Sequence, residues 1–163
     1  MTLKQLHAVV QAAMGWEDAH LWEFAVGRKR IGSSRATKLT QEALLQPRST
    51  KLTYIYDFGH CWEHQLTLTR PRAADPSLAY PRYLAGEHAA PPEYCGGIPG
   101  FYSQLEILAD PKHPDHPHTK DWFGDYDPNS FDEQPIKDRL ARITSRRAQR
   151  RPRSRHGGRN RAT

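Results

Sequence analysis

A chain of 163 residues with a net charge of +6 has the length of one domain with a tail and can bury a modest core. No apolar run approaches the roughly 20 residues of a membrane-spanning helix, and the N-terminus lacks the apolar core of a signal peptide. We therefore expect a cytoplasmic protein without a membrane partner. Two cysteines, Cys61 and Cys95, are too few for a disulfide framework and favour reduced thiols.

The net positive charge of the chain comes from its C-terminus. From residue 142 onward the chain carries arginines and no acidic residue: Arg142, Arg146, Arg147, Arg150, Arg151, Arg153, Arg155, Arg159 and Arg161. This segment alone carries a charge of +9. Because the whole chain carries +6, residues 1–141 carry a net charge of −3. Its glycine and proline content favours disorder. The sequence therefore predicts a mildly acidic folded domain over residues 1–141 and a disordered basic tail over residues 142–163.

The N-terminal part of the chain alternates helical and extended patterns. Thr2 can cap a helix whose apolar residues recur at helical spacing up to Gly15. The segment His20–Val26 predicts a strand, and the basic segment Gly27–Ser34 predicts a loop. A short helix is expected over Gln41–Leu45, where a following proline stops it.

The stretch from residue 52 to residue 68 predicts a β-hairpin, which we expect to seed the core. Apolar and aromatic residues alternate along both strands: Leu52, Tyr54 and Tyr56 in the first, and Trp62, His64, Leu66 and Leu68 in the second. A turn at Gly59 joins the strands. We expect this glycine to adopt a positive φ, which it tolerates because it has no Cβ.

The C-terminal part opens with a long segment rich in glycine and proline, Tyr80–Gly97, whose aromatic residues argue against disorder. A helix is expected from Gly100 to Asp110. The prolines on both sides of His116 predict a stiff, extended connector, followed by a short helical turn through Trp122. The last helix is expected near residues 135–143, where it gives way to the arginine tail.

Four segments, taken in this order, resemble the plasmid pRiA4b ORF-3-like family: Leu3–Glu23, Tyr54–Leu66, Tyr80–Gly100 and Phe101–Phe131. The resemblance implies an α+β roll, in which helices pack on an antiparallel sheet. Family members occur on plasmids and as passenger genes of insertion sequences, and some carry a resolvase or "TnpR-like" label. A serine recombinase needs a nucleophilic serine supported by clustered arginines within a folded domain, and the sequence does not supply that constellation.

The chain departs from the family pattern in three ways. It begins at the first helix, where the family usually has a strand, so we expect an uncovered sheet edge that favours self-association. His60 and Cys61 replace an acidic pair after Phe-Gly. In the long loop, Tyr83 and Ala90 occupy positions where the family often has cysteine, and Cys95 remains.

Three residues near the hairpin turn are candidate catalytic groups: Asp57, Glu63 and His64. A carboxylate beside a histidine can supply general acid–base catalysis. The same residues are also typical of a solvated hairpin end, with His64 on the apolar face as a core histidine. The sequence leaves both interpretations open.

Four residues in the loops of the C-terminal part are candidate metal ligands: His88, Cys95, His113 and His116. Zinc needs three or four nitrogen, sulfur or oxygen ligands that converge on one point. Prolines around His116 would splay its neighbours, and the missing loop cysteines weaken a thiolate site. We therefore expect neither a metal nor another cofactor.

The arginine tail is the clearest functional signal. Its candidate nucleic-acid-binding residues are Arg146, Arg147, Arg150, Arg151, Arg153 and Arg155. Such segments bind DNA or RNA through counterion release, independently of sequence. We therefore expect a non-catalytic protein tethered to nucleic acid. The alternatives are a hydrolase, nuclease or recombinase-like enzyme with a site near residues 57–64 and 80–100, and an adaptor that binds a protein partner.

Overall fold

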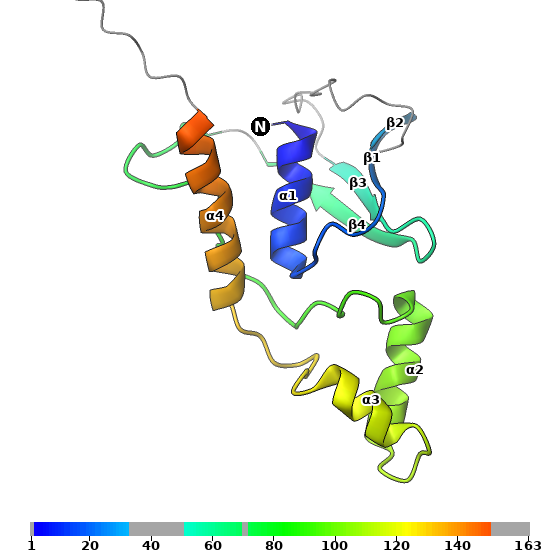
Figure 1. The fold of residues 1–163 in the computed structure, drawn as a ribbon. Helices are drawn as coiled ribbons and strands as arrows, with labels where there is room; N and C mark the ends of the chain where they lie inside the picture. The colour runs from blue at the N-terminus through cyan, green and yellow to red at the C-terminus, as the bar shows by residue number, and fades with distance from the viewer. Residues whose placement is uncertain (1, 33–50, 70–71, 151–163) are drawn as a thin grey trace, which may run out of the picture.

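The computed structural model describes residues 2–32, 51–69 and 72–150. Within these ranges the elements follow in the order α1 (Leu3–Met14), β1 (Trp22–Val26), β2 (Lys29–Gly32), β3 (Lys51–Tyr56), β4 (Trp62–Thr67), α2 (Gly97–Ala109), α3 (His116–Phe123) and α4 (Gln134–Arg150). The strands form one antiparallel sheet in the order β2-β1-β3-β4. Helices α1 and α4 lie side by side, and α2 and α3 form a separate pair (Figure 1). The α+β architecture expected from the sequence is confirmed.

Helix α1 has well-formed ends. Thr2 and Gln5 form a capping box, in which each side chain accepts the backbone N–H of the other residue. The helix ends at Gly15, whose φ of 73° lies in the left-handed region. Its apolar face packs on the sheet to form the main core: Leu3, Leu6, Val10, Trp16, Trp22, Phe24, Leu52, Tyr54 and Tyr56.

The predicted hairpin is confirmed as β3 and β4. Strand β3 lies inside the sheet, and its residues Tyr54 and Tyr56 are almost completely buried. The prediction of a positive φ at Gly59 was wrong, because Asp57 (55°) and Cys61 (51°) adopt that conformation instead. The Asp57 carboxylate accepts the Gly59 N–H, and aspartate tolerates the left-handed region when its side chain closes such a turn.

Two further predictions were wrong and one falls outside the structure. The segment Gly27–Ser34 is not all loop, because β2 pairs with β1 across a turn in which Gly27 has a φ of 58°. The connector around His116 is not extended, because this residue begins α3 and Pro117 lies in the first turn, where a missing N–H costs nothing. The short helix predicted over Gln41–Leu45 lies outside the described residues.

Helices α2 and α3 build a second, smaller core. Its buried members are Cys95, Phe101 and Phe123. Trp62, the first residue of β4, packs against this core and also against the main one. This single indole therefore joins the helix pair to the sheet.

The predicted last helix is confirmed and runs further than expected, to Arg150. It contacts α1 and buries Leu140, and Arg139 Nη1 donates a hydrogen bond to the Trp16 carbonyl oxygen at 2.9 Å. Residues 142–150 of the predicted tail thus belong to a helix anchored on the folded body. Residues 151–163 lie outside the part of the chain that the structure describes.

Within the described ranges, β2 and β4 form the edges of the sheet. Self-association through an uncovered edge stays a prediction. Among the same residues, no helix combines the length and the apolar character needed to cross a membrane.

A network of buried polar side chains ties α1 to the sheet. His7 is 4% exposed, with Nδ1 2.8 Å from the Tyr54 hydroxyl and Nε2 2.8 Å from Asp18 Oδ1. Gln11 Nε2 donates to the same tyrosine hydroxyl at 3.0 Å, and the His7 ring stacks on Trp22. Burial lowers the pKa of His7, although the neighbouring Asp18 carboxylate opposes this effect. Burial therefore disfavours the charged form of this histidine.

The free energy of unfolding should fall as the pH is lowered from about 7.5 to about 5.5. Burial lowers the pKa of both His7 and His64 in the folded state. Unfolded histidine titrates near a pKa of about 6.5, so the unfolded chain binds more protons below that pH. Stability present above this value is therefore lost as the pH falls.

Urea denaturation at a series of pH values measures this effect. His7→Gln lowers stability overall, but it should also make the unfolding free energy less dependent on pH. A wild-type unfolding free energy that stays constant or rises on acidification over this range would contradict the lowered pKa of these two histidines.

Candidate functional site at the hairpin tip

The turn between β3 and β4 is organised around Asp57. Its Oδ1 accepts the Gly59 N–H at 3.0 Å, and its Oδ2 lies 2.7 Å from His60 Nδ1. Its carbonyl oxygen accepts the N–H groups of His60 and Cys61, and its own N–H donates to the Leu21 carbonyl oxygen at 2.9 Å. Asp57 is thus fixed through its backbone and through both carboxylate oxygens.

A second histidine approaches the same carboxylate. His20 Nε2 lies 3.8 Å from Asp57 Oδ2. Burial raises the pKa of Asp57, but hydrogen bonds from His60 and the Gly59 N–H, together with the nearby histidine charges, outweigh it and lower the pKa below its usual value. The side chain of Asp57 is 13% exposed, whereas those of His20 and His60 are 30% and 44% exposed. An ionised, largely covered carboxylate therefore lies between two imidazoles that reach solvent.

The long loop before α2 supplies the other wall of this region. The Tyr94 ring meets the His20 ring edge-on, with ring centroids 5.4 Å apart. The preceding Glu93 accepts a hydrogen bond from the Tyr56 hydroxyl and another from the Glu17 N–H, the latter at 2.7 Å. These bonds hold the loop against β3 and against the segment that follows α1.

Close approach between the loop and the turn requires a glycine. Gly97 has a φ of 71°, and a Cβ at this position would lie 2.9 Å from the His60 Cβ. A larger residue would therefore be strained and would also displace His60. We refer to Asp57, His60, His20 and Tyr94 as the hairpin-tip site. Two of these four residues, Asp57 and Tyr94, adopt a positive φ, a strain that is common at functional sites.

The hairpin-tip site has the geometry for moving a proton. A carboxylate bound to one ring nitrogen orients an imidazole and leaves the other ring nitrogen for a reacting group. His60 Nδ1 makes that bond to Asp57, so Nε2 is the nitrogen that faces away from the carboxylate. The site can therefore hold a histidine general base.

The catalytic candidates of the sequence do not converge. Asp57 belongs to the hairpin-tip site. Glu63 lies on the exposed face of β4, where it accepts a hydrogen bond from Gln65 Nε2 at 2.9 Å. His64 is on the opposite, core-facing side, and its Nδ1 donates to the Trp62 carbonyl oxygen at 3.2 Å. Burial lowers the pKa of His64, as expected for a neutral core histidine.

The metal candidates are dispersed. His88 is exposed in the long loop, and Cys95 is buried in the second core, where burial raises the pKa of its thiol. His113 Nδ1 accepts the Asp115 N–H at 3.1 Å, and His116 begins α3. Within the described ranges, no three His, Cys, Asp or Glu side chains come close enough together to hold a metal ion.

His20 and Tyr94 were missed as site residues in the sequence. The strand pairing is the signal that could have pointed to His20. Trp22 lies opposite Tyr56, and the Asp57 N–H donates a hydrogen bond to the Leu21 carbonyl oxygen. Continuing this register by one residue places Leu21 opposite Asp57, and His20 is the residue next to Leu21. Tyr94 carries no such signal, because its position depends on the path of an irregular loop.

The nucleic-acid candidates divide into two groups. Arg146, Arg147 and Arg150 are positions in the last turns of α4. Arg151, Arg153 and Arg155 lie outside the described residues.

Comparisons with known proteins agree with this architecture. The sequence model of the family described as plasmid pRiA4b ORF-3-like protein matches residues 1–135. The uncharacterised protein y4hQ of Sinorhizobium fredii (strain NBRC 101917 / NGR234) is 36% identical over 139 residues, which cover 77% of this chain and 70% of that protein. The crystal structure of MM3350 from Methanosarcina mazei Go1, a protein of unknown function, is similar with a TM-score of 0.69 and 33% identity, over 85% of this chain and 83% of that one. The resemblance found in the sequence is confirmed, and the chain belongs to the plasmid pRiA4b ORF-3-like family.

Proposed function

We propose that the protein binds DNA or RNA through the arginines of α4 and of the segment that follows it, without reading the sequence. The observation that carries this proposal is the course of α4, which starts on the folded body and continues to Arg150. No acidic residue follows Asp138 in the chain. The helix thus starts in the packed part of the molecule and continues into a segment that contains arginines but no acidic residue.

Helical spacing supports a directed basic surface. Positions 139, 142, 146 and 150 recur at intervals of three or four residues, which places them on one face of α4. Arg139 is bound to the Trp16 carbonyl oxygen and half-buried, whereas Arg142 is exposed. The surface that we propose for phosphates therefore begins at Arg142.

The rest of the molecule does not add to this attraction. Residues 1–141 carry a net charge of −3, against +9 for the remainder. Affinity should therefore come from counterion release by the C-terminal arginines and fall steeply with salt. The body then acts as the group that is brought to nucleic acid.

Fluorescence anisotropy with duplex DNA over a salt series tests this proposal. The substitutions Arg146→Gln, Arg147→Gln and Arg150→Gln, combined in the full chain, should weaken binding and lower the slope of log K against log salt by about 2 to 3. Substitutions are preferable to truncation after residue 141, because that cut would fall inside α4.

The control variant combines Arg28→Gln, Arg82→Gln and Lys112→Gln, which removes the same charge from exposed positions elsewhere. This variant should keep the wild-type salt slope to within about 1. Equal losses in both variants would mean that only net charge matters. An unchanged slope in the α4 variant would contradict the proposal.

We infer a second candidate function from the contact between His60 and Asp57. In this function the protein is a hydrolase that uses His60 as its general base. A phosphodiester in the bound nucleic acid would be a natural substrate. The contact is short, at 2.7 Å, and His20 and Tyr94 lie beside it.

Hydrolysis of single-stranded and duplex oligonucleotides by the purified full chain tests this candidate. His60→Gln should reduce any turnover by about 100-fold or more, since general base catalysis typically supplies 10²–10⁴-fold. Asp57→Asn should reduce it as well, whereas His64→Gln should retain turnover in whatever fraction stays folded. Turnover that survives His60→Gln would exclude this role for His60.

A further inference from the structure

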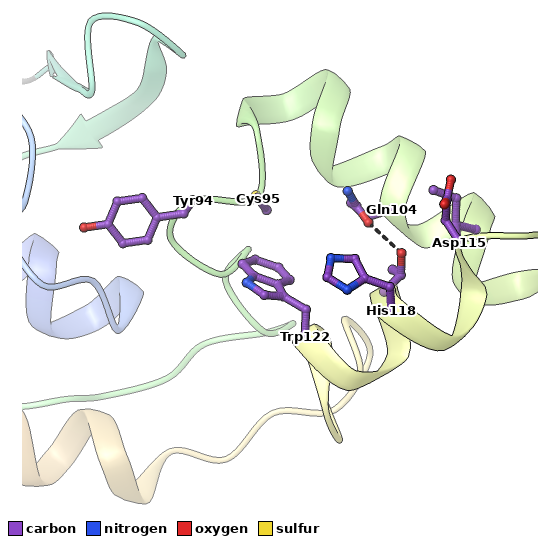
Figure 2. Close-up of a pocket in the computed structure, with 8 residues that line it drawn as sticks. Tyr94, Cys95, Gln104, Asp115, His118 and Trp122 are labelled. Atoms are coloured by element: carbon purple, nitrogen blue, oxygen red, sulfur yellow. Dashed lines mark hydrogen bonds between the residues drawn. The ribbon is translucent and has the colours of Figure 1, made fainter.

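A pocket of about 310 Å³ lies between α2 and α3, next to the hairpin-tip site. Figure 2 shows the rings of Trp122 and His118 projecting from α3 into the space beneath α2, where Gln104 lies. Tyr94 and Cys95 line its side toward the sheet. We propose that this pocket binds a single unpaired nucleobase, an inference that rests on the nucleic-acid binding proposed above and extends it to single strands.

An accessible aromatic ring gives the pocket a stacking surface. The indole of Trp122 is 47% exposed, whereas Trp16 and Trp22 are 3% and 8% exposed and belong to the core. Tyr94 also lines the pocket and is 65% exposed, but its ring points toward the sheet and away from Trp122 (Figure 2), so Trp122 supplies the stacking surface. Unpaired bases stack on aromatic side chains of this kind irrespective of their identity, because every base has a π face.

Gln104 provides a hydrogen-bonding group for the edge of the base. Its Oε1 accepts the Thr119 hydroxyl at 3.1 Å, and Thr119 is 3% exposed. This partly buried bond orients the carboxamide. It leaves a second lone pair on Oε1 and both amide N–H groups for a ligand. A carboxamide can donate to and accept from the edge of one base at the same time.

The charge of the pocket favours a base over a phosphate. Its lining contains no arginine or lysine, and it includes Asp115, which would repel a phosphate group. The Cys95 thiol, whose pKa is raised by burial, closes one side with a neutral group. A neutral, flat heterocycle meets these conditions, and the volume is at the lower end of the range for small-molecule pockets.

The two proposed contacts with nucleic acid are separated in the molecule. The C-terminal end of α4 and the α2–α3 pair lie at opposite ends of the fold (Figure 1). A strand that engages both must therefore span the length of the body. Short ligands therefore occupy one contact only, and this separates the two proposals experimentally.

The first experiment uses uncharged nucleosides, which the arginines of α4 do not attract. Adenosine, cytidine, guanosine and uridine are titrated into the full chain while amide and indole resonances are followed by NMR. We expect saturable shifts of the Trp122 indole N–H and the Gln104 side-chain amide, with the indole signals of Trp16 and Trp22 unchanged. No saturable shift with any of the four nucleosides would overturn the proposal.

Variants at the pocket complete the test. Gln104→Leu should weaken nucleoside binding at least about fivefold, measured from the shift of the Trp122 indole N–H. Trp122→Leu should weaken it by a similar factor, measured from the shift of the Gln104 side-chain amide. Tyr102→Ala is the control, because Tyr102 is an aromatic residue of α2 that is even more exposed than Trp122 (61% against 47%) and does not line the pocket. Wild-type affinity in both pocket variants, or equal loss in the control, would also overturn it.

Oligonucleotides then distinguish this proposal from the proposed function. Gln104→Leu should weaken binding of a single-stranded oligonucleotide at fixed salt and leave duplex binding unchanged. The α4 arginine variant should weaken both. Loss with the arginine variant alone contradicts the base pocket, and loss with the pocket variant alone contradicts the arginine contact.

Discussion

Two tyrosine hydroxyl groups on β3 hold this fold together. The side chains of Tyr54 and Tyr56 are 0% and 1% exposed, so each hydroxyl must find partners inside the protein. Tyr54 meets His7 and Gln11 of α1. Tyr56 accepts the N–H groups of Ala19 and His20, at 3.0 and 3.3 Å, and donates to Glu93 of the long loop. One inner strand thus positions the helix, the segment after it and the loop.

The hairpin-tip site is a consequence of these bonds. His20 is held by its backbone N–H at Tyr56, and Tyr94 follows directly after Glu93, which is bound to the same hydroxyl. Asp57 is the next residue along the chain from Tyr56. Residues from three distant segments therefore converge because they share one buried phenol. Trp62 extends the arrangement to the α2–α3 pair, since it packs against both cores.

The sequence predicted the elements that depend on local patterns and failed where tertiary contacts decide. The capping residue Thr2 and the stop at Gly15 marked α1 correctly, and alternation of apolar residues marked β3 and β4. Strand β2 was missed, because its basic residues resemble a solvated loop and it exists through pairing with β1. The start of α3 was predicted wrongly as an extended connector. Proline is compatible with the first turn of a helix as well as with an extended segment, so the sequence does not distinguish the two.

The candidate site shows the same division. Asp57 was predicted because a carboxylate at a hairpin turn is visible in the sequence. Glu63 and His64 were named with it because they flank the same turn, and strand alternation, which the sequence already shows, places them on opposite faces of β4. Gln104 and Trp122 of the α2–α3 pocket lie on two helices whose packing against each other is not encoded in any local pattern. Sequence reasoning therefore named one residue of the candidate site, Asp57, but not the residues that the fold places beside it.

The most direct test of this account compares backbone amide resonances and hydrogen exchange in Tyr56→Phe and Tyr54→Phe. Loss of the Tyr56 hydroxyl should shift and deprotect the amides of Ala19 and His20, and also that of Glu17, which donates to Glu93. Loss of the Tyr54 hydroxyl should instead affect the amide of Asp18, which donates to Gln11 Oε1. Each substitution should cost roughly 1–3 kcal/mol of stability, because it leaves buried groups without a partner. Unchanged amides at residues 17, 19 and 20 in Tyr56→Phe would contradict the claim that this hydroxyl assembles the site.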